Sequence, residues 1–191
     1  PDIVKWIELR REAVRNITMK VANAVKSVKP DAILSAALKP EEATKTIEYR
    51  RKDLLTGSEV TVEIPGKIWQ IVNFGQVYED FAKLGYWLIP MTYHIDYGYS
   101  LEWIREVMNY TSTLAEKYNT IALAGIQCHG NIDYEEVVKA TKMAIDGGAR
   151  GWVYFNIHYF LPLAWNVKWS KYKQQVMNTQ EKVKTLEQTI N

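Results

Sequence analysis

The stretch 85-GYWLIPMTYHIDYG-98 changes character halfway along its length. Its first half is apolar, and Trp87, Leu88 and Met91 are residues typical of a buried strand. Its second half carries hydrogen-bonding and titratable groups, among them His94 and Asp96. This order predicts a core strand that ends in a polar loop, which is where parallel-sheet proteins place their ligand sites.

Apolar runs of the same kind recur along the chain and alternate with amphipathic segments. We predict strands at 32–38, 86–93, 120–128 and 151–157, and helices at 6–29, 67–84, 100–118 and 133–146. Ser100 and Asp133 are the expected N-caps of the last two helices, and Gly147 stops the final one. Repeated alternation of strand and helix predicts an α/β fold with a parallel sheet built of crossover units.

Two segments depart from this alternation. Residues 41–66 are expected to hold a hairpin-like insertion, because alternating apolar residues flank the turn at 56–58. Residues 165–191 predict a long polar helix with a narrow apolar seam. That helix either packs on its own domain or forms a coiled-coil stalk. The chain therefore divides into a domain at 1–164 and an amphipathic C-terminal helix at 165–191.

Composition excludes several classes of function. The 191 residues are 47% hydrophobic with a net charge of +2, so we expect a globular domain without a nucleic-acid partner. The longest apolar run, 152–165, is too short and too polar to span a membrane. A single cysteine, Cys128, excludes an internal disulfide. Sequons at Asn16 and Asn109 favour an extracellular or cell-surface location.

Two parallel-sheet architectures accommodate four strand–helix units: a small open doubly wound sheet and part of a (β/α)8 barrel. Periodicity alone does not separate them. No Gly-rich phosphate loop follows any of the predicted strands, so a nucleotide-binding open sheet has no support and we expect no cofactor.

Three motifs, taken in order, resemble the C-terminal half of glycoside-hydrolase-like TIM barrels, the broad group that includes family-10-like glycosidases. They are W…LRREAVRNITMKVANAVKSVKPDAILSAAL at 6–38, GYWLIPMTYHIDYG at 85–98 and GARGWVYFNIHYF at 148–160. The resemblance covers about residues 5–160 and implies four βα units of the barrel, its strands five to eight. Such a half barrel would expose two strand edges. We therefore expect it to pair with the missing N-terminal half or with another copy of the chain, as an oligomer or a fragment.

Polar side chains gather where the predicted strands end, the active-site edge of TIM barrels. All three histidines of the chain fall at such positions. Asp96 is the best candidate for a catalytic carboxylate. The expected carbohydrate-binding residues are Tyr93, His94, Gln127, His129, Trp152, Asn156, His158 and Tyr159.

Glycoside hydrolysis needs two carboxylates, and the second one is not evident in this chain. Asp133 follows the third strand but is expected to cap a helix. The leading hypothesis is a glycoside-hydrolase-like barrel segment that acts on or binds a poly- or oligosaccharide. The alternative is a non-catalytic surface or scaffold protein with a degenerate barrel and a helical stalk. A weaker alternative is a metal-dependent hydrolase that uses His94, His129 and His158, although we assign no metal ligands.

Overall fold

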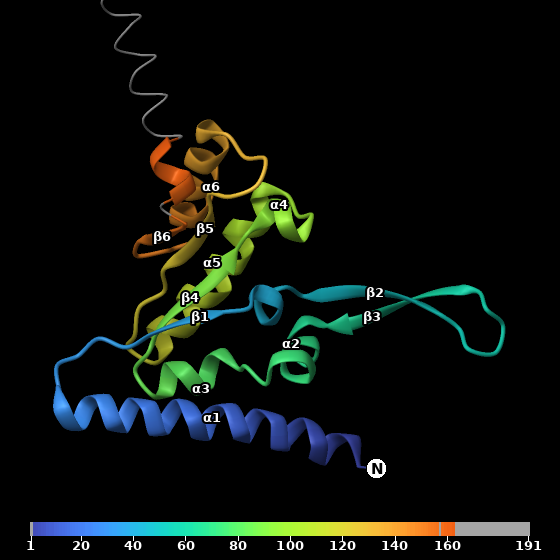
Figure 1. Ribbon diagram of the computed structural model, residues 1–191, viewed down its shortest axis with the longest axis horizontal. Helices are drawn as coiled ribbons and strands as arrows, with labels where there is room; N and C mark the ends of the chain where they lie inside the picture. The colour runs from blue at the N-terminus through green and yellow to red at the C-terminus, as the bar shows by residue number, and fades with distance from the viewer. Residues whose placement is uncertain (1, 157, 163–191) are drawn as a thin grey trace, which may run out of the picture.

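The computed structural model describes residues 2–156 and 158–162 (Figure 1). Its elements are, in chain order, α1 (Ile3–Val28), β1 (Ser35–Leu38), the 3-10 helix η1 (Pro40–Ala43), β2 (Thr46–Lys52), β3 (Glu59–Pro65), α2 (Gly66–Phe74), α3 (Tyr78–Lys83), β4 (Trp87–Thr92), α4 (His94–Tyr97), α5 (Leu101–Lys117), β5 (Ala124–Gln127), α6 (Tyr134–Asp146) and β6 (Trp152–Phe155). The predicted α/β class with a parallel sheet is confirmed.

Four strands form one parallel sheet in the order β1-β4-β5-β6. The register places Ala37 beside Ile89, Met91 beside Gly125, and Gln127 beside Phe155. The spatial order of the strands equals their order along the chain, so every crossover steps in the same direction across the sheet. All four carboxyl ends therefore meet at one edge.

One face of this sheet is buried against helices. In β4, Leu88, Pro90 and Thr92 are buried, whereas the alternate residues Ile89 and Met91 are partly exposed. Helices α3 and α5 pack on β4, and α6 packs on β5. The core between these layers includes Leu38, Leu88, Ile104, Val107, Ile126 and Val137.

The predicted helix at 67–84 is wrong in one respect, because the segment forms two helices rather than one. Gly75 ends α2 with a φ of 66°, and α3 begins only at Tyr78. A Cβ at Gly75 would lie 2.8 Å from the carbonyl oxygen of Arg10 in α1. The break therefore follows from a left-handed C-cap that also lets α1 approach closely.

The predicted hairpin is confirmed as β2 and β3, which pair in antiparallel fashion from Thr46 to Pro65. Its loop is closed by a 2.8 Å hydrogen bond from the Asp53 amide to the Ser58 carbonyl, and Gly57 supplies a φ of 70°. The hairpin extends away from the rest of the chain (Figure 1). At its base, Tyr49 contacts Trp69 of α2 with ring centroids 5.3 Å apart.

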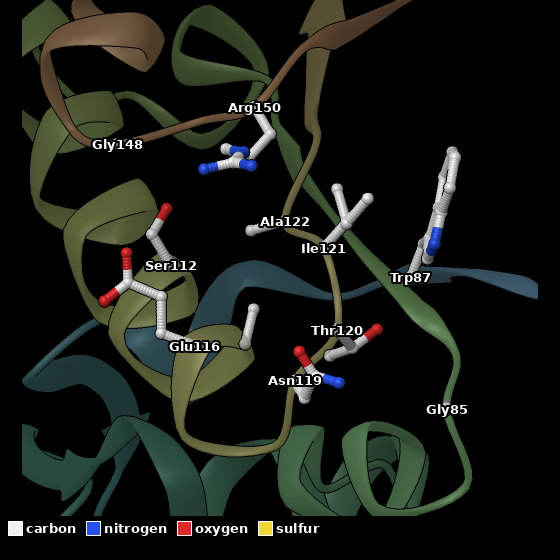
Figure 2. A pocket seen from close by; sticks show the side chains of 11 residues that line it. Gly85, Trp87, Ser112, Glu116, Asn119, Thr120, Ile121, Ala122, Gly148 and Arg150 are labelled. Carbon is white, nitrogen blue, oxygen red and sulfur yellow. The ribbon is translucent and has the colours of Figure 1, made fainter.

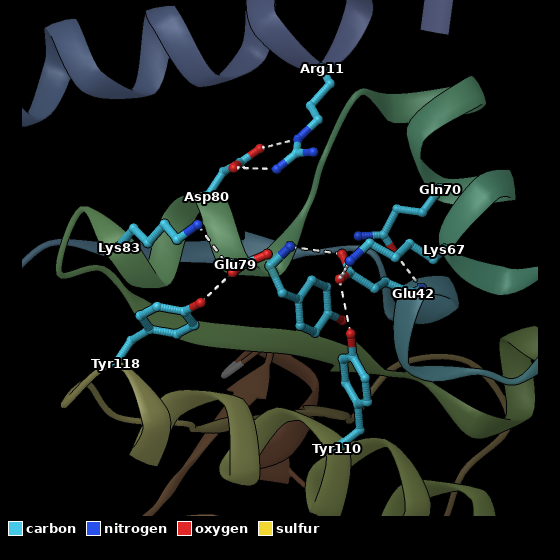
Figure 3. Close-up of polar contacts among 10 residues, drawn as sticks. Arg11, Glu42, Lys67, Gln70, Glu79, Asp80, Lys83, Tyr110 and Tyr118 are labelled. Atoms are coloured by element: carbon cyan, nitrogen blue, oxygen red, sulfur yellow. Dashed lines mark hydrogen bonds and ion pairs between the residues drawn. The ribbon is translucent and has the colours of Figure 1, made fainter. Parts of the chain in front are cut away.

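A buried carboxylate joins η1 to three helices (Figure 3). The Glu42 side chain is fully buried. It accepts hydrogen bonds from the Tyr78 amide at 2.7 Å and from the Tyr110 hydroxyl at 3.0 Å, and it lies 3.5 Å from the Lys67 ammonium. The Glu42 amide donates in turn to the Gln70 side-chain oxygen at 2.6 Å. Burial raises the pKa of Glu42, and these hydrogen bonds offset that effect only in part.

A second polar contact fixes α1 onto α3. Arg11 donates two hydrogen bonds of 2.7 Å to the two carboxylate oxygens of Asp80. Asp80 is buried, whereas the Arg11 side chain is 38% exposed. The bidentate geometry orients the long helix α1 against the domain (Figure 3).

The predicted C-terminal helix at 165–191 lies outside the described residues. Within the part of the chain that is described, no helix combines the length and the apolar character needed to cross a membrane.

Candidate functional site at the carboxyl ends of the strands

Four of the predicted site residues meet at the edge where the parallel strands end. Tyr93 and Asp96 follow β4, Gln127 ends β5, and His129 lies two residues further on. Phe155, the last residue of β6, completes the group. Since β4, β5 and β6 are adjacent and parallel, residues far apart in the sequence reach one place.

Asp96 is held from two sides. Its Oδ1 accepts a 2.7 Å hydrogen bond from the Gln127 amide nitrogen, and its Oδ2 lies 2.8 Å from His129 Nε2. The backbone amide of Asp96 also donates to the Gln127 side-chain oxygen at 3.3 Å. Gln127 is 1% exposed, whereas the Asp96 side chain is 47% exposed. The carboxylate is therefore oriented by the buried Gln127 and the partly exposed His129, yet remains accessible from solvent.

His129 bridges β6 and Asp96. Its Nδ1 lies 3.1 Å from the carbonyl oxygen of Phe155, so each ring nitrogen faces an acceptor. Burial by itself would lower the pKa of His129, but the hydrogen bonds to Phe155 and Asp96, together with the charge of Asp96, outweigh burial and raise it. The arrangement favours an imidazolium that donates from both nitrogens.

An aromatic group flanks this pair. Tyr93 stacks on Phe155 with ring centroids 5.6 Å apart and an interplanar angle of 19°, and it meets His129 edge-on at 5.4 Å. Burial raises the pKa of Tyr93 to about 12, so its phenol stays protonated and can donate a hydrogen bond. Phe155 is 50% exposed, and its ring lies 5.5 Å from that of His129, the partner of Asp96. Phe155 was not among the predicted site residues, because the sequence placed it only inside the predicted strand 151–157.

A second carboxylate lies at the same edge. Glu41, in η1 just after β1, is 8% exposed, and its Oε2 has no hydrogen-bond partner among the described residues. Burial raises the pKa of Glu41. Burial, followed by the charges of Glu41 and Asp96, raises the pKa of Tyr97. Lys39 Nζ donates to the Tyr97 hydroxyl at 3.2 Å and completes the group.

Sequence reasoning also missed Glu41, because it was assigned to the insertion at 41–66. The sequence feature that could have identified Glu41 is the run Lys39-Pro40-Glu41-Glu42, which follows an apolar strand directly. In the structure, this run forms η1 and stays at the sheet edge.

The remaining predicted residues lie outside this group. His94 is 3% exposed and points toward α6, where its Nε2 lies 3.1 Å from Glu136 Oε1. Trp152 is 44% exposed and contacts Tyr154, which packs on the helix side of the sheet with Phe160.

The segment after β6 makes local contacts of its own. The Asn156 side-chain oxygen accepts from the His158 amide at 3.1 Å, and the His158 ring meets Tyr159 edge-on at 5.4 Å. The three histidines therefore have separate surroundings. Across residues 2–156 and 158–162, no three His, Cys, Asp or Glu side chains gather as a metal site would require. The three-histidine hydrolase is not supported.

Cys128 precedes His129 but has a different role. It is 1% exposed and belongs to the core on the helix side of the sheet. Burial raises the pKa of its thiol to about 11, the opposite of what a nucleophilic cysteine needs. Cys128 is therefore a small buried core residue.

The geometry thus combines two carboxylates, an oriented imidazole, two phenols and an exposed ring face at one sheet edge. This set can bind hydroxyl groups and transfer a proton. In comparisons with protein-family models, curated proteins and solved structures, the chain matches none of them.

Proposed function

We propose that this chain is the carboxyl-terminal part of a glycoside-hydrolase-like barrel that acts on a poly- or oligosaccharide. The observation that carries the proposal is the Asp96 carboxylate, which is oriented by Gln127 and His129 and yet is 47% exposed beside an aromatic face. Sugar rings stack on such faces, and their hydroxyls pair with carboxylate, amide and imidazole groups.

The strand arrangement supports the half-barrel part of the proposal. A barrel requires strands that follow one another in chain order, and the order β1-β4-β5-β6 meets this requirement. On the face away from the helices, Met91 is partly exposed, and Val153 and Phe155 are 44% and 50% exposed. We propose that strands from an N-terminal half, or from a second copy, cover this face and complete the barrel.

The two carboxylates suit different chemical roles. Both oxygens of Asp96 already act as hydrogen-bond acceptors, which fits a base or a nucleophile better than the acid. Glu41 is buried and its pKa is raised, which fits the group that donates a proton to the leaving oxygen. In this assignment Tyr97 and Lys39, which share a 3.2 Å hydrogen bond, position the substrate hydroxyls.

One observation favours a second candidate, a non-catalytic carbohydrate-binding or scaffold protein. The contact between Asp96 and His129 is a complete ion pair when the imidazole is charged. An ion pair of this kind stabilises a loop without any catalysis.

The test measures reducing ends released from a panel of polysaccharides by the wild-type chain and by three variants. Asp96→Asn and Glu41→Gln are expected to lower the rate by about 10²- to 10⁴-fold. Asp31→Asn, at an exposed position away from the site, is the matched control and should leave the rate unchanged. Binding without hydrolysis that Asp96→Asn weakens would support the second candidate. If the chain neither binds nor hydrolyses any polysaccharide of the panel, both candidates are refuted.

A further inference from the structure

A separate pocket of about 500 Å³ opens at the opposite edge of the sheet, near the amino ends of β4, β5 and β6 (Figure 2). Trp87, the first residue of β4, lines it, whereas Asp96 follows the other end of that strand. The lining also includes Ser112, Glu116, Asn119, Ile121, Ala122 and Arg150. None of these groups takes part in the site at the carboxyl ends.

Ser112 is the first sign that this pocket holds a ligand. The residue is 8% exposed, and its hydroxyl has no hydrogen-bond partner among the described residues. Other helical hydroxyls of this chain behave differently. Those of Thr18, Thr111, Thr113 and Thr141 each donate to the carbonyl oxygen four residues earlier. The Ser112 hydroxyl instead lines the cavity, where an unmet hydrogen bond is unfavourable unless a ligand or water supplies a partner.

Two opposite charges at the rim are the second sign. Arg150 and Glu116 both line the pocket, and neither forms an ion pair within the described part of the chain. Their charges cancel, so the pocket does not select a strongly charged ligand. The guanidinium offers donors and the carboxylate offers acceptors, while the Asn119 amide offers both.

The pocket also has an apolar wall. Ala115 and Ala122, two alanines of the lining, contribute their methyl groups. A neutral pocket with mixed donors and acceptors, next to an apolar wall, matches a molecule whose hydroxyls both donate and accept and whose ring carries C–H groups. That is the chemistry of a neutral sugar.

We propose that this pocket binds a neutral saccharide unit through Ser112, Glu116, Asn119 and Arg150, with Ala115 and Ala122 as its apolar wall. The inference does not depend on hydrolysis at Asp96, because it is argued from a different set of side chains at the other edge of the sheet. A chain with both sites would hold a saccharide at a place remote from the one where it acts.

The test is an NMR titration of the full chain with glucose, galactose, xylose, N-acetylglucosamine and cellobiose, with the Ala122 and Gly148 amides as reporters. Saturable shifts of both signals with at least one sugar are expected. Ser112→Ala and Arg150→Gln should each weaken the binding by roughly tenfold. Arg15→Gln, at an exposed position of α1, is the matched control and should bind like the wild type.

Three results would overturn the proposal. One is that none of the sugars shifts the two reporters. Another is that a sugar binds with equal affinity to the wild type and to both pocket variants. The last is that inorganic phosphate or glutamate shifts the reporters while every sugar fails, which would identify an anion or zwitterion site. Asp96→Asn, tested in parallel, should leave the affinity of the pocket for the sugar unchanged. The failure of the pocket proposal is therefore distinguishable from the failure of the proposed function at Asp96.

Discussion

Replacing Glu42 by alanine tests whether the buried carboxylate holds η1 to the helices. The variant leaves the Tyr78 amide, in a fully buried residue, without the acceptor that it meets at 2.7 Å. An unpaired buried N–H costs about 1–3 kcal/mol. Tyr110 and Lys67 are 37% and 45% exposed and can turn to water, so their losses are small. We expect the free energy of unfolding to fall by about 2 kcal/mol.

The pH dependence of the same residue has a defined sign. The pKa of Glu42 is raised in the folded state, chiefly by burial. The folded chain therefore holds this proton more tightly than the unfolded chain, and the corresponding stability is present at low pH. It is lost as the pH rises from the ordinary value of 4.5 through the raised value. Glu42→Gln removes this loss, so the variant should gain stability relative to the wild type as the pH rises.

The assay is urea unfolding followed by tryptophan fluorescence, across a pH series from about 4 to about 8. Glu41 also has a raised pKa, but it is present in both proteins, so its contribution cancels in the difference. Glu63→Gln, at an exposed position of β3, is the control. The reasoning is refuted if Glu42→Ala costs less than about 0.5 kcal/mol. A difference between Glu42→Gln and the wild type that does not vary with pH would refute it as well.

Three further predictions concern packing, reactivity and the α1 contact. Gly66→Ala should destabilise the fold by about 3 kcal/mol, because its Cβ would lie 1.9 Å from the Thr44 carbonyl oxygen; an unchanged thermal midpoint would contradict this. Cys128 should resist Ellman's reagent at neutral pH and react only after unfolding, since burial raises its thiol pKa to about 11; rapid labelling of the native chain would disprove it. Arg11→Met should lower stability by about 1–2 kcal/mol in urea unfolding, as buried Asp80 loses both hydrogen bonds; a neutral effect would show that the pair contributes little.

The order of elements was predictable because it rests on local patterns. The cap at Asp133 is an example, since its side chain accepts from the Glu136 amide at 2.8 Å, only three residues away. Ser100 was also correctly predicted to precede α5 directly, although its side chain makes no capping hydrogen bond. The spatial order of the strands had no such local signal, because periodicity does not say which strands are neighbours.

Only part of the candidate site was predicted from the sequence. The alternation of side chains along a strand explains most of the predicted residues that lie elsewhere. Adjacent residues at a strand end point in opposite directions, so Tyr93 and His94 could not both face the open edge. The same argument separates Trp152 from Phe155. Glu41 was missed for another reason. Its place at the edge depends on η1 folding back against α2, a tertiary contact that no short sequence pattern reveals.

The sequential strand order also bears on how the chain folds during its synthesis. Each new strand of the sheet pairs with the strand of that sheet made before it, so the pairs can form in the order of synthesis. Each parallel pairing closes a crossover loop, the longest of them between β1 and β4, so it forms more slowly than the β2–β3 hairpin. The sheet can therefore grow one strand at a time as the chain leaves the ribosome. Within residues 2–156 and 158–162, β6 is the last strand to join the sheet, and its outer edge pairs with no other described strand.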